Sequence, residues 1–228
     1  MANTVEWLDL GEINYDDALS IQCELHEACW RNTRPDVLIF QRNEPVITCG
    51  ADSDQDHILW EDERLQGAGI KKRAVPRGGG VSYHGPGQMV VSTVLHFLRY
   101  RKTAHLFLRA VEEVIIRLLN SYGIEGLRIE GKSGVFAGND KIAAVGLALS
   151  HLVTMHGVSL NICPDMNHYD AIIACGLSDT GVTSLELLGR TPPYDEVRDV
   201  FISNFADVFE AIPVPMKDYG IQGKTRDA

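Results

Sequence analysis

Residues 77–98 read RGGGVSYHGPGQMVVSTVLHFL, and they join a glycine-rich segment directly to a long apolar run. Residues 77–88 contain five glycines, a proline, an arginine and a histidine. Residues 89–98 are apolar and rich in β-branched residues, which is typical of a central strand. A segment with so few side chains brings its backbone close to a ligand, because glycine accepts positive φ and leaves its amide groups accessible.

The glycine-rich segment lacks the signatures of the common phosphate-binding loops. A P-loop requires GxxxxGK followed by Ser or Thr at the start of a helix, and a dinucleotide-binding fingerprint also precedes a helix. Here a predicted strand follows, and no lysine stands at the P-loop position. An ordinary tight surface turn stays open as an alternative, although such turns seldom also contain Arg, Tyr and His.

Helical patterns flank this segment on both sides. Residues 15–31 and 103–122 have the spacing of amphipathic helices, and Thr103 is a suitable N-cap for the second. A last helix is predicted over residues 194–212, where Pro213 and Pro215 would end it.

Strand-like runs fill most of the remaining chain. Taken together, the elements predict an α+β fold in which helices pack on a mixed β-sheet. One domain is expected over residues 1–221, followed by a polar tail at 222–228. The predicted strands lie at residues 5–10, 37–40, 46–49, 70–75 and 89–98, with several short ones between 127 and 187.

Composition excludes several classes of protein. The 228 residues are 45% hydrophobic, enough for a core, yet no run approaches the ~18 apolar residues of a membrane span. Five cysteines without a CxxC pair indicate free thiols in a reducing compartment, and a net charge of -10 disfavours nucleic-acid binding. We therefore expect a cytoplasmic protein that binds neither nucleic acid nor membrane.

Two side chains could carry chemistry near the glycine-rich segment. Lys141 opens the apolar run KIAAVGLAL, where an inward-pointing lysine would be either salt-bridged or poised to lose its proton. Pointing outward, it would be an ordinary charge at a strand end. Cys175 precedes Gly176 in IIACGL; buried cysteines usually only fill space, but an accessible backbone amide beside this one would suit an acyl oxyanion.

His84 and His156 each precede a glycine, and neither belongs to an HExxH motif or to a Cys/His ligand spacing. Hydrogen-bonding or space-filling roles are therefore favoured for them, and no metal site is predicted.

The order of these motifs resembles that of a known family. RGGGVSYHGPGQ, KIAAVGL, HGVSLNI and ACG followed by TSL resemble the lipoyl(octanoyl) transferases, and the resemblance runs from YDDALSIQ at residue 15 to residue 188. It implies the fold of the biotin and lipoate ligase catalytic domain, and an octanoyltransferase that needs neither ATP nor a metal. Positions 136, 158, 159 and 174, occupied by Phe, Val, Ser and Ala, differ from the residues usual in that family.

The resemblance also implies roles for individual residues. In that family the cysteine corresponding to Cys175 carries the acyl group as a thioester, and the lysine corresponding to Lys141 lowers its pKa and serves as acid and base. The implied substrate-lining residues are Arg77, Gly78, Gly79, Gly80, Val81, Ser82, Tyr83, His84, Ala144, Val145, Gly146, His156, Gly157, Val158 and Ser159.

The implied partners are octanoyl-acyl carrier protein as donor, and as acceptors the lipoyl domains of 2-oxoacid dehydrogenase E2 subunits and the glycine cleavage H protein. A monomer is expected. The basic clusters around residues 71–73 and 99–102 would dock the acidic carrier, or they are ordinary solvated strand ends. An ATP-dependent lipoate or biotin ligase, a non-catalytic acyl-binding relative, and a cysteine hydrolase with a histidine base stay open as alternatives.

Overall fold

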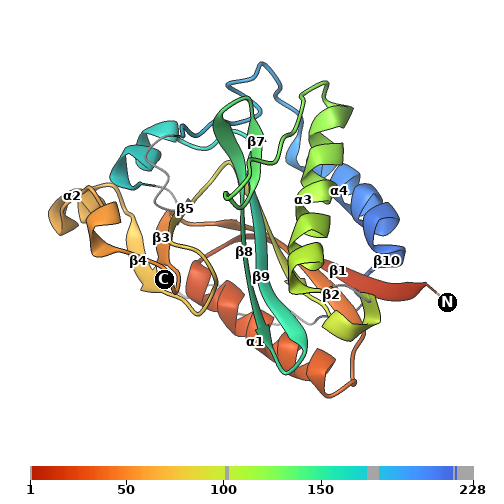
Figure 1. Ribbon diagram of the computed structural model, residues 1–228. Helices are drawn as coiled ribbons and strands as arrows, with labels where there is room; N and C mark the ends of the chain where they lie inside the picture. The colour runs from red at the N-terminus through yellow and green to blue at the C-terminus, as the bar shows by residue number, and fades with distance from the viewer. Residues whose placement is uncertain (1, 101–102, 174–179, 218, 220–228) are drawn as a thin grey trace.

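The computed structural model describes residues 2–100, 103–173, 180–217 and 219 (Figure 1). Its strands form a seven-stranded sheet in the order β10-β1-β2-β6-β9-β8-β7 and a three-stranded sheet in the order β4-β3-β5. In the large sheet β1 runs parallel to both β2 and β10, and the other neighbours are antiparallel. The predicted α+β class with a mixed sheet is confirmed.

The two sheets use strands from separate parts of the chain. The small sheet contains β3 (Val46–Cys49), β4 (Lys71–Ala74) and β5 (Val81–His84). The large sheet contains β1 (Asn3–Ile13), β2 (Asp36–Asn43), β6 (Gln88–Val94), β7 (Val135–Ala137), β8 (Asp140–Ser150), β9 (Val153–Asn161) and β10 (Ala211–Pro215).

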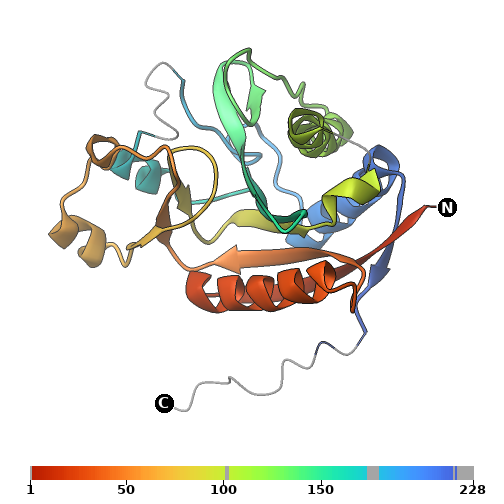
Figure 2. The same cartoon turned by 60° about the horizontal axis from the view of Figure 1, so that its bottom comes forward.

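Helices cover both faces of the large sheet, as Figure 2 shows for α1 on one side and for α3 and α4 on the other. The N-cap of α3 is Thr103, as predicted, since its side chain accepts a hydrogen bond from the Leu106 amide. The helices are α1 (Tyr15–Trp30), α2 (Asp62–Gly67), α3 (Ala104–Ser121) and α4 (Tyr194–Phe209), with 3-10 turns η1 (Gln55–His57), η2 (Phe97–Tyr100) and η3 (Met166–Ala171).

Strand alternation in β2 connects the two layers of core. Val37 and Ile39 point toward α1, whereas Leu38 and Phe40 point into the cluster formed with α3 and α4. All four side chains are fully buried. A strand with apolar residues on both sides has to lie between two layers of helices, so β2 fixes the centre of the fold.

Several elements end at other residues than predicted, and the ends of α4 and β6 are the clearest cases. Helix α4 ends at Phe209, three residues early, because Glu210 adopts a left-handed conformation with φ 52. Pro213 and Pro215 then lie in β10, a strand at the edge of the sheet, where a residue without an N–H is tolerated. The strand predicted over 89–98 ends at Val94, and η2 takes the place of its last residues.

A buried carboxylate joins η2 to the sheet. Asp36 is fully buried and accepts hydrogen bonds from the Tyr100 hydroxyl at 2.5 Å, from the His96 amide at 3.0 Å and from the Cys29 thiol at 3.3 Å. It also forms an ion pair with Arg99. A buried charge with this many donors stabilises the corner where β2, β6 and α1 meet.

Replacing Asp36 with alanine should lower the free energy of unfolding by about 3–5 kcal/mol, because it leaves buried donors without an acceptor. Urea denaturation measures this change as a lower midpoint with an unchanged slope. Asp199→Ala is the control, since this carboxylate pairs with Arg198 at the surface and its loss should cost no more than about 1 kcal/mol. Equal midpoints for the two variants would contradict a stabilising role for Asp36.

Candidate functional site

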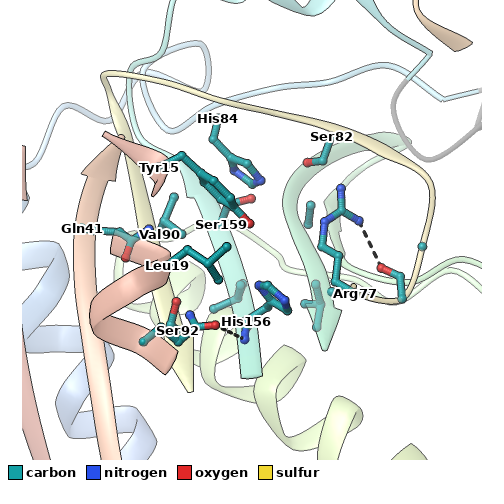
Figure 3. A pocket seen from close by; sticks show the side chains of 18 residues that line it. Tyr15, Leu19, Gln41, Arg77, Ser82, His84, Val90, Ser92, His156 and Ser159 are labelled. Atoms are coloured by element: carbon teal, nitrogen blue, oxygen red, sulfur yellow. Dashed lines mark hydrogen bonds between the residues drawn. The ribbon is translucent and has the colours of Figure 1, made fainter. Parts of the chain in front are cut away.

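A cavity lies on the α1 face of the large sheet, where the segment before β5 reaches across from the small sheet (Figure 3). Its walls come from α1, β2, β6, β8, β9 and residues 77–84. Of the residues expected to contact substrate, those lining it are Arg77, Gly78, Gly79, Ser82, His84, Ala144, Val145, Gly146, His156, Gly157, Val158 and Ser159.

Three other expected residues do not line this cavity. Val81 and Tyr83 alternate with Ser82 and His84 along β5, so they point to the opposite side, into the small core that covers the small sheet. The hydroxyl of Tyr83 bonds there to Nδ1 of His168 at 2.7 Å. Gly80 also lies outside the lining.

The sequence reasoning missed the opposite walls of the cavity. Tyr15, Leu19 and Gln22 are spaced i, i+4 and i+7, so one face of α1 presents all three to the cavity. A glutamine on the apolar side of a predicted helix could have indicated a polar cavity wall, although only the fold shows which cavity that side of the helix borders. Three further residues, contributed by the strands, are Gln41, Val90 and Ser92.

The glycine-rich segment is held in place by its own backbone. The Gly78 amide donates to the Leu147 carbonyl at 3.1 Å, and the Gly79 amide donates to the Asp52 carboxylate at 3.0 Å. At Gly50 an added Cβ would lie 2.2 Å from the Gly79 carbonyl oxygen, so only glycine permits this approach. Since two amides of the segment are already used, it forms a wall of the cavity and not an anion cradle.

Arg77 places a buried positive charge in that wall. Its side chain donates to the Thr48 carbonyl and hydroxyl, both at 2.8 Å, and to the Gly78 carbonyl at 3.1 Å. These bonds tie the start of the segment to β3, and they compensate for the desolvation of the guanidinium.

Both histidines of the cavity are held neutral. Burial first, and then the charge of Arg77, lowers the pKa of His84 to about 3 and that of His156 to about 4. His156 has the unusual φ of 57, and its amide donates to the Gln22 side chain at 3.1 Å. Its Nε2 is buried and has no hydrogen-bond partner among the described residues.

Lys141 points inward, into a smaller neighbouring cavity. The residue is 5% exposed, its Nζ has no hydrogen-bond partner in the described part of the chain, and it lies 5.4 Å from the centre of the Phe136 ring. Its backbone pairs with the strand-like segment 181–183, and the lining of this cavity is Ser82, Lys141, Ile142, Ala143, Ala144, Asn161, Tyr169 and Val182.

The second residue expected to act in catalysis, Cys175, lies outside the described residues, as does Ala174. The segment 181–183 that pairs with Lys141 follows Cys175 by six to eight positions in the sequence.

The basic residues considered for docking are paired with carboxylates. Lys71 lies 3.2 Å from Glu44, Lys72 lies 2.5 Å from Asp62, and a 2.7 Å ion pair joins residues 73 and 16. Arg99 pairs with the buried Asp36, while residues 101 and 102 lie outside the described chain. The ion pairs of Lys71, Lys72 and Arg73 leave little net positive charge at the first cluster. Docking at either cluster stays a prediction.

No group of three or more His, Cys, Asp or Glu side chains that could hold a metal ion occurs within the described residues. In the same part of the chain, no helix is long and apolar enough to cross a membrane.

Comparison with known proteins assigns the family. Residues 14–206 match the model of the lipoyl protein ligase A/B catalytic domain. The chain belongs to this family. An octanoyltransferase from Caldanaerobacter subterraneus is 36% identical, and the match covers 90% of each chain. An octanoyltransferase from Solibacter usitatus is 39% identical, and the match covers 90% of this chain and 93% of the relative. A Nostoc punctiforme octanoyltransferase is 44% identical over 76% of this chain and 74% of its own.

Solved structures share the fold of this lipoyl protein ligase A/B family member at low sequence identity. The bi-partite lipoate protein ligase from Thermoplasma acidophilum superposes with a TM-score of 0.71 at 18% identity, covering 96% of this chain and 87% of that one. Lipoate-protein ligase A bound with ATP gives 0.70 at 16%, with 95% and 89% covered. Biotin protein ligase from Aquifex aeolicus gives 0.51 at 13%, with 92% and 70% covered.

The buried histidines make the stability of this family member depend on pH. Because the folded pKa of His156, about 4, lies below its ordinary value of 6.5, the unfolded chain binds more protons between these values. The free energy of unfolding should therefore fall as the pH drops through this window, by up to about 1.4 kcal/mol per pH unit for this group.

His156→Asn should flatten that slope, since asparagine tolerates the left-handed backbone and does not titrate here. Urea denaturation from pH 7 to pH 4 measures both proteins, and their shared carboxylates cancel in the difference. Parallel stability curves would show that His156 is not held neutral.

Proposed function

We propose that the large cavity holds the acyl chain of an octanoyl group, which this protein transfers onto a lysine of a lipoyl domain. The observation that carries the proposal is the position of the buried Lys141 directly beside a cavity with neutral histidines and glycine-rich walls. The naming of its relatives as octanoyltransferases supports the same reaction. The protein is accordingly an acyltransferase.

The cavity suits a short alkyl chain. Gly146 and Gly157 are register partners on β8 and β9, so two neighbouring strands carry no side chain at this level. Each methylene removed from water contributes about 0.8 kcal/mol, enough for an eight-carbon chain to bind with useful selectivity.

A thioester on Cys175 accounts for the role of a lysine without a hydrogen-bond partner among the described residues. Ordinary pKa values of about 8.5 for a thiol and about 10.4 for an amine leave both groups mostly protonated at neutral pH. Close to Lys141 the thiol would lose its proton, because the ammonium stabilises the thiolate. The thiolate then attacks the donor thioester, and the donor's sulfur leaves with a proton from Lys141.

In the second half of the reaction the acceptor amine attacks the acyl-enzyme. A new C–N bond forms, the C–S bond breaks, and the now neutral Lys141 takes up the proton of the amine. The conversion of a thioester and an amine into an amide and a thiol releases free energy. The proposed scheme therefore needs no ATP, and none of its steps involves a metal ion. The proposed donor is octanoyl-acyl carrier protein, and the proposed acceptors are lipoyl domains of E2 subunits and the glycine cleavage H protein.

The Cys175→Ala variant should form no octanoyl adduct when mixed with octanoyl-acyl carrier protein, because it lacks the attacking sulfur. Intact-protein mass spectrometry reads out the adduct, and a lipoyl domain added afterwards should remove it from the wild-type protein. Cys163→Ala is the matched control, since this exposed cysteine lies outside the lining of both cavities and should keep the adduct. An octanoyl adduct on Cys175→Ala would refute the nucleophile, and modification of the lipoyl domain only with ATP and free octanoate would indicate a ligase.

Chain-length preference should change in Gly146→Val. A Cβ at this position would already lie 3.2 Å from the Gly78 carbonyl and 3.3 Å from Cδ of Arg77, so the larger side chain has to occupy the cavity. We expect kcat/KM for octanoyl transfer to fall about tenfold or more, and the loss to be smaller for butanoyl transfer, because fewer methylenes compete for the space.

The control for this variant is Ala148→Val, two positions further along β8 and outside the lining of the cavity. It adds two of the three carbon atoms that Gly146→Val adds, and it should keep the preference of the wild type. A proportional loss for both acyl groups in Gly146→Val would place the alkyl chain elsewhere.

A further inference from the structure

A fully buried carboxylate, Glu112, lies on α3 beside the chain that leads into β7. Its Oε1 accepts a hydrogen bond from the Gly134 amide at 3.0 Å, and its Oε2 accepts one from the Arg128 side chain at 3.2 Å. Arg109, one turn earlier on the same helix, donates to Oε2 at 2.7 Å. One carboxylate therefore attaches both ends of the segment 128–134 to α3, in the stretch of chain that connects α3 to β7 (Figure 1).

Gly134 lies directly against the start of β8, where Lys141 is located. A Cβ at Gly134 would clash with the Ala143 carbonyl oxygen and would lie 3.5 Å from Cε of Lys141. Only glycine permits this approach, and its φ of 104 also belongs to the region that glycine favours. The backbone at residue 134 is therefore one of the surfaces that border the lysine side chain.

The strand that follows carries a second surface beside Lys141. The centre of the Phe136 ring lies 5.4 Å from Nζ of the lysine. The pairing of β7 with β8 is irregular between Val135 and Phe136, so regular strand pairing does not set the position of this part of β7. The attachment to Glu112 adds a constraint from α3 at the residue just before the irregularity.

The direction of the Lys141 side chain depends on such packing. Its amine has no hydrogen-bond partner in the part of the chain that the structure describes. A lysine has a flexible stem and usually extends its charged end toward water. Here the stem lies against Gly134, and the amine points into the small cavity beside the space proposed for the acyl chain.

We infer that Glu112 is a positioning residue for Lys141, an inference that rests on the proposed function of this lysine. Glu112 holds residue 134 against the lysine stem, and this contact keeps the amine in the small cavity. The carboxylate itself touches no substrate, because it is fully buried and lies outside the lining of both cavities. Its effect should therefore appear in the rate of the reaction and not in substrate binding.

Two substitutions at position 112 separate the reach of this side chain from its charge. Glu112→Asp keeps the charge but is one methylene shorter; the flexible arginine side chains can follow it, whereas the Gly134 backbone cannot. We expect kcat to fall about tenfold or more, with KM for octanoyl-acyl carrier protein within about threefold of the wild type. Glu112→Gln keeps the length and an oxygen for the Gly134 amide, so kcat should stay within about threefold, although the loss of two ion pairs should lower Tm.

Gly134→Ala changes the same contact from the other side. Its methyl group would clash with β8 and displace residue 134 without removing a partner of the Glu112 ion pairs, so kcat should fall as in Glu112→Asp. Glu113→Ala is the matched control on α3, because Glu113 pairs with Arg117 and Arg128 while the Gly134 amide bonds to Glu112. This control should keep the kcat of the wild type.

Activity is measured with octanoyl-acyl carrier protein and a lipoyl domain, and thermal unfolding of every variant is measured alongside. Wild-type kcat in Glu112→Asp and Gly134→Ala would overturn the inference. A loss in Glu112→Gln or Glu113→Ala as large as that in Glu112→Asp would also overturn it, since charge or stability would then explain the effect. If the wild-type protein forms no octanoyl adduct, or if Lys141→Met keeps wild-type kcat, the proposed function fails, which is distinct from a failure of Glu112 alone.

Discussion

The site depends on the backbone hydrogen bonds that attach residues 77–80 to both sheets. On one side, Gly50, Ala51 and Asp52, directly after β3, donate to carbonyls of this segment. On the other side, the Gly78 amide donates to Leu147 on β8. Nothing larger than glycine fits at Gly50, where the chain after β3 approaches residues 77–79, so the junction tolerates no side chain there. A cavity walled by so constrained a segment is formed before any ligand arrives.

Burial determines which side chains around the cavity carry a charge. Arg77 keeps its positive charge because three oxygen atoms of the protein surround it. The same charge, added to desolvation, keeps His84 and His156 neutral. A wall that combines one compensated cation with neutral rings suits an uncharged alkyl chain, since no unpaired charge has to be buried against hydrocarbon. Neither of these two histidines therefore titrates near neutral pH.

Local patterns in the sequence predicted α1, α3, α4 and the central strands, because the spacing of apolar residues decides those elements. The Thr103 cap and the two-sided apolar strand at Val37 to Phe40 are examples. The short helix α2 was not predicted. The boundaries and the short edge strands were less predictable. Strand β10 forms because it pairs with the edge of β1, and no pattern within residues 211–215 reveals this pairing. In the same way, strand β5 within the glycine-rich segment depends on pairing with β3.

Only the side of the candidate site that the sheet forms could be predicted from the sequence. Resemblance identified the segments on the sheet side, and twelve of their residues line the cavity. The α1 wall of Tyr15, Leu19 and Gln22 was not predictable, because an amphipathic helix does not reveal which cavity its polar positions border. The direction of Lys141 was equally undetermined, since an irregularity in the pairing of β7 with β8 lies directly beside it.

The shared fold does not decide the chemistry, because this chain and ATP-bound lipoate-protein ligase A superpose over most of their length at 16% identity. The reaction depends on which polar groups at the site are not already used in hydrogen bonds within the protein. Here the amides of Gly78 and Gly79, which could otherwise have held an anion, are used within the protein. The buried amine of Lys141, by contrast, is left without a hydrogen-bond partner among the described residues. A site that occupies its anion-binding donors and keeps a buried amine available is better suited to proton transfer at a thioester than to holding a nucleotide phosphate at this loop.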